Sequence, residues 1–136
     1  MKLSTKGRYG VTAMFDLAAH GNGEPITAAA ISERQRIPLA YLEQLLAKLR
    51  KAKLVKTVRG PSGGYALTKK PRQVSIGDII RATDGPIALA ACLPAPGACP
   101  KSGCCSTRSL WRSLSSKVSQ VFDSTNLEDL CKEAHK

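Results

Sequence analysis

Three cysteines in the second half of the chain have a residue type and spacing that could bind a metal. Six residues separate Cys92 from Cys99 and five separate Cys99 from Cys105, with Cys104 beside the last of them. The sequence contains no Cys-x-x-Cys step of the kind that zinc ribbons and thioredoxin-like enzymes use. Three thiolates can hold an iron–sulfur cluster, which usually has four protein ligands. Spacing alone leaves an iron–sulfur cluster, a zinc site and a group of free thiols as alternatives.

The segment that carries these cysteines is expected to be a long loop between two helices. Residues 85–105 are rich in Pro, Gly and Cys and contain few helix signals. A loop of this length within a compact domain usually has a function of its own. Before it, Ser75 can cap a short helix over residues 76–82, which the sequence Asp84-Gly85-Pro86 ends. Binding a metal or cluster through its cysteines would be such a function for this loop.

A long helix is predicted after the loop, over residues 106–123. Its apolar residues form a wide stripe: Leu110, Trp111, Leu114, Val118, Val121 and Phe122. Such a stripe is too large to stay exposed, so we expect this helix to pair with its copy in a homodimer, with packing against its own domain as the alternative. Thr125 and Glu128 have the spacing of a capping box for a short last helix that contains Leu127 and Cys131.

Positive charge is concentrated in the first half of the chain. The formal net charge is +11; residues 1–72 contain 14 Lys and Arg against 4 Asp and Glu, whereas residues 73–136 contain 7 against 6. This asymmetry favours a polyanionic partner, and nucleic acid is the simplest one. A membrane surface is disfavoured because no helix sets large apolar residues opposite a solid basic face. Aromatic residues make up only 4%, which argues against a single-strand binder that stacks bases.

The basic half contains the pattern of a helix-turn-helix. Thr27 can cap a short helix over residues 28–35, and Pro38 suits the first position of the next helix. In that second helix Leu39, Leu42, Leu46 and Leu49 recur at helical spacing and are expected to form its buried face. The opposite side carries a polar strip, consisting of Ala40, Glu43, Gln44, Lys48 and Lys51. A helix of this kind could enter a DNA major groove, although a solvated surface helix is the simpler alternative.

A glycine-rich hairpin follows the second helix directly. Residues 54–58 and 65–68 have strand composition, and the sequence Arg59-Gly60-Pro61-Ser62-Gly63-Gly64 between them is typical of a turn. A hairpin after a recognition helix is a wing, whose glycines let the backbone approach a phosphate chain and whose Arg59 could reach a minor groove. The alternative is an ordinary surface hairpin. The helix, the hairpin and the charge asymmetry together favour a winged helix-turn-helix.

Four segments also resemble one family. These are MKLSTKGRYGVTAMFDLA at the start, ISERQRIPLAYLEQLLAKLRKAKLV, the wing VRGPSGGY, and the three-cysteine loop that leads into Leu110-Trp111-Arg112. They resemble the IscR family of bacterial winged-helix regulators, which includes iron–sulfur, nitric-oxide and redox sensors. The resemblance runs in order from Met1 to about Leu130. It implies a mainly α-helical fold with a small β-hairpin, and a homodimeric transcription factor that binds palindromic operators.

The resemblance also implies roles for individual residues. Cys92, Cys99 and Cys105 match the family's three cysteine ligands to a 2Fe–2S cluster, and Arg108 stands where the family has a histidine as fourth ligand. A guanidinium is a very poor metal ligand, so the fourth ligand is left to Cys104, a partner-subunit residue or an exogenous thiol.

The same resemblance assigns residues that contact DNA. Matching positions are Tyr41, Glu43, Gln44, Arg59 and Pro61, while Ala40 replaces a serine and loses a hydroxyl contact. With Lys48 and Gly60, which the helix and turn patterns add, these residues form the expected reading surface. The Glu43 carboxylate would be repelled by DNA phosphates. It can bind in the groove only where a cytosine amino group donates a hydrogen bond to it, so it can decide which operators are bound.

These features lead to one expected function and two alternatives. We expect residues 1–72 to bind DNA, residues 73–105 to bind the cluster and residues 106–136 to dimerise, giving a mainly repressing regulator of iron–sulfur cluster biogenesis genes. The first alternative is a cluster-free redox or nitric-oxide sensor of the same fold, using cysteine oxidation. The second is a metalloenzyme or metal carrier, which is disfavoured because the loop offers no acid/base pair.

The chain is expected to be cytoplasmic. Its N-terminal apolar stretch is interrupted by Asp16, unlike the core of a signal peptide. The longest clean apolar run, residues 87–93, is far shorter than the ~20 residues that span a bilayer.

Overall fold

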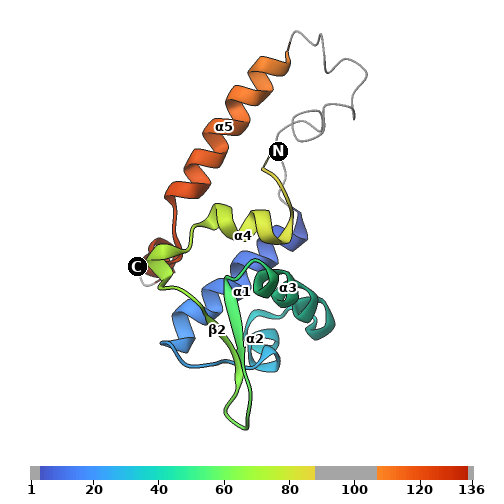
Figure 1. Cartoon of the computed structure of the whole chain (residues 1–136), viewed down its shortest axis with the longest axis vertical. Coiled ribbons are helices and arrows are strands. Elements are labelled where there is room, and N and C mark those ends of the chain that lie inside the picture. Colours follow the sequence, from blue (N-terminus) through green and yellow to red (C-terminus); the bar gives the residue numbers. More distant parts are fainter. Residues whose placement is uncertain (1–3, 88–106, 135–136) are drawn as a thin grey trace.

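The computed structural model describes residues 4–87 and 107–134, which form a helical body with one hairpin (Figure 1). The elements in chain order are α1 (Thr5–Gly21), α2 (Ala28–Gln35), α3 (Leu39–Lys51), β1 (Val55–Val58), β2 (Gly64–Leu67), the 3-10 helix η1 (Pro71–Gln73), α4 (Ile76–Thr83), α5 (Arg108–Ser124) and α6 (Leu127–Ala134). The hairpin projects from one end of the body and α5 extends from the other. The predicted fold class, mainly α with a small β-hairpin, is confirmed.

Helix α1 lies at the centre of the body. Ser4 caps it by accepting from the Gly7 N–H, and Asn22 ends it in the left-handed conformation. α1 packs against α2, α3, α4, α6 and β2. Its buried apolar residues join those of the other elements in a single core cluster, which includes Met14, Leu17, Ile31, Leu46, Val55, Val74, Ile79 and Leu127. The helix-turn-helix, the wing and the C-terminal helix therefore share one hydrophobic core.

The helix-turn-helix consists of α2 and α3. Thr27 caps α2 through the Ala30 N–H, and Arg36 ends it with a left-handed backbone at φ 55°. In α3 the buried leucines are Leu42, Leu45, Leu46 and Leu49. The predicted leucine face was therefore wrong in one position, because Leu39 is 42% exposed and Leu45 takes its place in the core. Pro38 lies at the N-cap, one position before the helix.

The hairpin is anchored to the segment before α2. Strands β1 and β2 are antiparallel, with Val55 opposite Leu67 and Val58 opposite Gly64. Tyr65 and Ile26 exchange two backbone hydrogen bonds, of 2.7 and 2.8 Å. Gly64 allows this contact: its φ is +151°, and a Cβ there would overlap the carbonyl of Ile26. The wing is thus fixed at its base against the helix-turn-helix.

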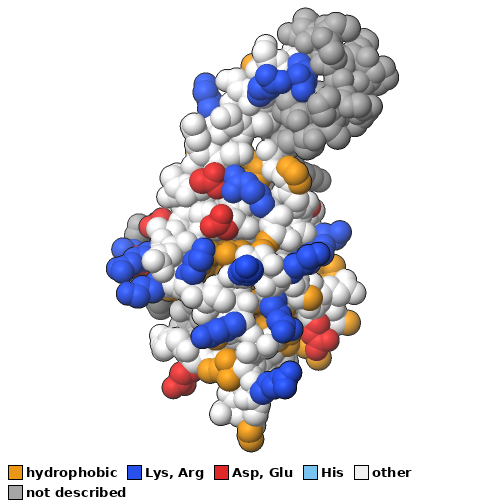
Figure 2. Space-filling model, viewed as in Figure 1, with side chains coloured by type: hydrophobic (Ala, Val, Ile, Leu, Met, Phe, Trp, Pro, Cys, Tyr) orange, Lys and Arg blue, Asp and Glu red, His pale blue; other side chains and the backbone are white. Residues whose placement is uncertain are grey.

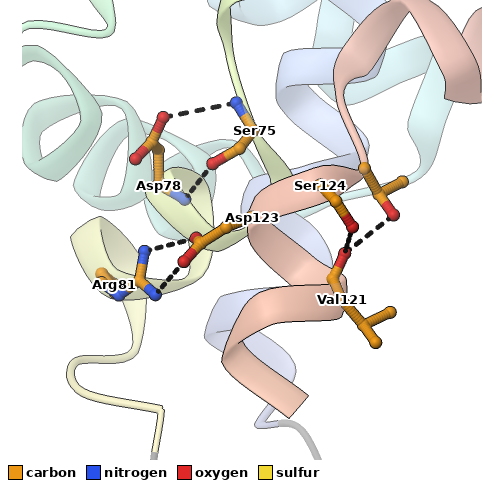
Figure 3. Close-up of polar contacts among 7 residues, drawn as sticks. Ser75, Asp78, Arg81, Val121, Asp123 and Ser124 are labelled. Carbon is orange, nitrogen blue, oxygen red and sulfur yellow. Dashed lines mark hydrogen bonds and ion pairs between the residues drawn. The ribbon is translucent and has the colours of Figure 1, made fainter. Parts of the chain in front are cut away.

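Helices α4, α5 and α6 are joined at one junction, drawn in Figure 3. Ser75 and Asp78 form the capping box of α4. Arg81 of α4 donates two hydrogen bonds, of 2.8 and 2.9 Å, to the Asp123 carboxylate of α5. A Cβ on Gly77 would overlap that carboxylate, so glycine permits the approach of α5 to α4.

The predicted capping box of the last helix was wrong by one residue. Asn126 and Asp129 cap α6, with bonds of 2.8 and 3.1 Å between side chain and backbone. Thr125 belongs to the end of α5 instead: its hydroxyl donates to the Val121 carbonyl, and its own carbonyl accepts from the Ile76 N–H.

Candidate nucleic-acid interface

The polar strip of α3 faces solvent, as the sequence predicted. Ala40, Glu43, Gln44, Lys48 and Lys51 are all exposed along the side opposite the buried leucines. Among the described residues, the strip is exposed from Ala40 to Lys51, as a helix that enters a major groove requires.

Tyr41 is less accessible than the rest of the predicted reading surface. It is half-buried, packs against the core cluster and meets the ring of Tyr9 edge-on, with 5.8 Å between ring centroids. This aromatic pair joins the first turn of α3 to α1. Tyr41 therefore sets the position of α3, and only its exposed part is free for a partner.

Lys48 touches a second helix as well as solvent. Its Nζ lies 3.5 Å from the backbone carbonyl of Thr83, the last residue of α4. A cation at a helix C-terminus is favoured by the carbonyl dipoles there. Thr83 also packs against Gly10 of α1, where a Cβ would overlap its side chain. α3 is thus connected to the helix that leads into the cysteine segment.

The wing tip places its predicted residues in solvent. Arg59, Gly60 and Pro61 are exposed. Gly60 has φ +108°, and its carbonyl accepts from the Gly63 N–H at 3.0 Å, closing a tight turn. Gly63 is required for this closure, because a Cβ there would overlap the Val58 carbonyl.

An ion pair between a buried carboxylate and a partly exposed arginine, which the sequence did not predict, joins α2 to α1. Asp16 is fully buried and accepts two hydrogen bonds from Arg34, at 2.7 and 3.0 Å, and one from Gln35 at 2.9 Å. Burial alone would raise the pKa of Asp16, but the hydrogen bonds from Arg34 and Gln35 and the charge of Arg34 hold that pKa below its usual value. The signal in the sequence is a carboxylate within an apolar helical face, since such a group needs a partner when it is buried.

The surface charge agrees with a polyanionic partner. Residues 31–60 contain eight Lys and Arg but only Glu33 and Glu43 as acidic residues. Figure 2 shows blue Lys and Arg side chains spread over the helical body and the base of the hairpin, with few red acidic ones. Phosphates of a duplex would meet attractive potential across this end of the molecule.

The predicted metal ligands Cys92, Cys99, Cys104 and Cys105 lie outside the described residues. Within residues 4–87 and 107–134, no three His, Cys, Asp or Glu side chains are placed to hold a metal. The fifth cysteine, Cys131, is half-buried in α6; burial and then the Glu128 carboxylate raise the pKa of its thiol, which disfavours the thiolate that binds metals.

Arg108, at the position of the expected fourth ligand, is the first residue of α5. Its side chain is half-buried, and its Nε is buried without a hydrogen-bond partner in the part of the chain that the structure describes. A guanidinium offers donors only, so this side chain does not complete a metal site.

Residues 3–133 match the Rrf2 family, described as an iron-dependent transcriptional regulator. The chain belongs to the Rrf2 family. It is 49% identical over 130 residues to the HTH-type transcriptional regulator IscR of Aliivibrio salmonicida, covering 96% of this chain and 77% of that protein. It is 47% identical to IscR of Vibrio cholerae, covering 96% and 75%.

Solved structures of Rrf2-type regulators have the same fold. T. potens IscR superposes with a TM-score of 0.80 at 43% identity, covering 98% of this chain and 88% of that one. CymR, the global cysteine regulator of B. subtilis, gives a TM-score of 0.79 at 40% identity and covers 98% of both chains. This chain is accordingly an IscR-like transcriptional regulator, and the winged-helix prediction is confirmed. None of its described helices has the length and apolar character of a membrane span.

Proposed function

We propose that this Rrf2-family regulator binds double-stranded DNA as a homodimer, with α3 in the major groove and the wing against the minor groove of each half of a palindromic operator. The observation that carries the proposal is the uncovered strip of α3 next to an exposed wing that carries Arg59. Lys48 and Lys51 would neutralise phosphates, while Glu43 and Gln44 would meet base edges.

The dimer would form through α5. Leu110, Trp111 and Val121 of this helix are 50%, 38% and 64% exposed, although they belong to its apolar stripe. Among the described elements α5 contacts chiefly α4, so within residues 4–87 and 107–134 these three side chains stay largely uncovered, while Leu114, Val118 and Phe122 are half-buried. A second copy of α5 would cover them, and a two-fold dimer matches a palindromic site.

The cysteine segment would carry the sensor. Three thiolates, Cys92, Cys99 and Cys105, form a suitable donor set for a 2Fe–2S cluster, with Cys104, a residue of the partner subunit or an exogenous thiol as fourth ligand. A cluster would supply a group that responds to iron supply and oxidation. The family description, iron-dependent, and the IscR relatives support this assignment. On the basis of the same relatives, we propose that the protein acts mainly as a repressor and that its targets are genes for iron–sulfur cluster biogenesis.

The cysteine segment begins directly after α4, and α4 contacts both α3 and α5. Lys48 meets the Thr83 carbonyl at one end of α4, and Arg81 binds Asp123 of α5. A change in the segment would therefore shift how two reading helices are spaced in a dimer. Coupling of this kind is typically worth ~1–3 kcal/mol between two sites.

Two measurements test the proposal. The first uses duplexes enriched from a random pool by the full-length protein. The Arg59→Ala variant should bind them about tenfold more weakly than the wild type at fixed salt, and its affinity should fall less steeply as salt rises. Arg72→Ala is the matched control, because Arg72 is exposed on η1, away from the wing, and should bind normally. If both variants bind equally, the wing assignment is wrong.

The second measurement concerns the cofactor. Anaerobically purified protein should absorb in the visible and contain iron and acid-labile sulfide, and it should bind at least one enriched duplex differently after the iron is removed. Colourless protein without iron would favour the cluster-free thiol sensor. Equal affinity of loaded and iron-free protein for every duplex would remove the proposed switch.

A further inference from the structure

Leu39 is an exposed leucine at the start of the reading helix. It is the first residue of α3 and is 42% exposed, whereas the other leucines of this helix are buried. It is absent from the core cluster that contains Leu42, Leu46 and Leu49 of the same helix. Its side chain is available for a partner.

The neighbours of Leu39 are the residues proposed to read bases. Ala40 follows it on the exposed strip, and Glu43 lies one turn further along, so the side chains of Leu39 and Glu43 are neighbours on the helix surface. In helix-turn-helix proteins the N-terminal residues of the recognition helix contact base edges. Leu39 is therefore at the depth where a base, and not a phosphate, would be met.

The major groove offers one strongly apolar group, the C5-methyl of thymine. We infer that Leu39 contacts a thymine methyl group, next to the cytosine whose amino group would donate to Glu43, and that it acts as a specificity-determining residue. This inference rests on the proposed DNA binding. It predicts that each half-site contains a thymine within one or two base pairs of that cytosine. The Cβ atoms of residues four apart on a helix are about 5–6 Å apart, and base pairs are stacked about 3.4 Å apart.

A second copy of the chain is the competing occupant of Leu39. The apolar stripe of α5 already offers a dimer surface, and Figure 1 shows α5 extending from the body on the side opposite the hairpin. A dimer formed through α5 leaves the strip of α3 uncovered. Leu39 would then be free for DNA.

The test removes the methyl group from DNA and the side chain from the protein. The probe is the tightest duplex enriched from a random pool by full-length wild-type protein. Each thymine is replaced in turn by deoxyuridine, which lacks only the methyl group, and affinity is measured by fluorescence anisotropy at fixed salt. One position per half-site should weaken wild-type binding about fourfold, the factor for one buried methyl group.

Variants identify the residue responsible. In Leu39→Ala the deoxyuridine penalty should disappear, while Leu39→Met, which keeps the apolar reach, should retain it. Val58→Ala is the matched control, because Val58 is an apolar side chain of the wing that is 39% exposed, and this variant should keep the full penalty.

The outcomes separate a failure of the proposed DNA binding from a failure of the Leu39 assignment. If no duplex is enriched, the proposed DNA binding fails. If duplexes are enriched but no thymine is sensitive, or if Leu39→Ala keeps the wild-type penalty, the Leu39 assignment is overturned while DNA binding stands. If Leu39→Ala lowers the dimer mass in sedimentation, Leu39 lies against the partner copy and the assignment is also wrong.

Discussion

Removing Arg34 should destabilise the protein much more than removing another exposed arginine. The Asp16 side chain is fully buried and the Arg34 side chain is 39% exposed, so Arg34→Ala leaves a buried carboxylate whose remaining hydrogen-bond partner among the described residues is Gln35. Breaking a fully buried pair typically costs ~3–5 kcal/mol, and the partial exposure of Arg34 places this case at the lower end, about 3 kcal/mol. For a chain of this length we expect the melting temperature to fall by roughly 10 °C.

The pH dependence tests the cause. In the wild type the pKa of Asp16 is lowered, so its stabilising contribution is present above the unfolded-state value of about 3.9 and is lost as pH falls through the lower folded-state pKa. In Arg34→Ala, burial would dominate and raise this pKa, so the variant regains stability as its carboxyl is protonated. The difference in unfolding free energy between wild type and variant should therefore shrink as pH falls.

The assay is urea unfolding from pH 7 down to pH 4, at one protein concentration because dimerisation also affects stability. Arg72→Ala, which removes an exposed arginine with no ion pair among the described residues, should change the unfolding free energy by less than about 0.5 kcal/mol. The double variant Asp16→Asn/Arg34→Ala, which carries no buried charge, should be more stable than Arg34→Ala. A loss for Arg34→Ala no larger than for Arg72→Ala, or one independent of pH, would refute the reasoning.

Three other changes have expected outcomes. Gly64→Ala should cost ~1–3 kcal/mol in urea unfolding, because its Cβ would overlap the Ile26 carbonyl at a φ of +151°; an unchanged midpoint would show that the wing base can relax. Glu43→Ala should let the protein bind a wider set of duplexes in a pooled binding assay, since the carboxylate that rejects unsuitable bases is gone; an unchanged selectivity would exclude that role. Arg108→His should prolong the visible absorption of anaerobically loaded protein on exposure to air by adding an imidazole ligand, and an unchanged decay would mean that residue 108 does not reach the cluster.

Local signals in the sequence determined most element boundaries. Thr27 and Ser75 are short polar side chains just before helical patterns, and each accepts from a backbone N–H at the start of its helix. The hairpin was predicted from strand composition on either side of a glycine-rich turn, and its strands end within one residue of the expected positions. Such signals act over a few residues, so they can be recognised without knowledge of the fold.

Only the tertiary structure decided which of several equivalent candidates is used. Helical spacing allows either Leu39 or Leu45 on the buried face of α3, and in the folded chain Leu45 is buried while Leu39 stays exposed. The sequence predicted the cap of α6 at Thr125, but the Thr125 hydroxyl donates to the Val121 carbonyl at the end of α5, and Asn126 caps α6 instead.

The partners of buried charge were also decided by tertiary contacts. The sequence shows Asp16 within an apolar face, but its partner Arg34 lies 18 residues away and is brought to it by the crossing of α2 over α1. Residue type and spacing determine what a segment can form, because caps, turns and periodicity act locally. Which face is covered, and which polar groups meet, depends on long-range packing that no local pattern records.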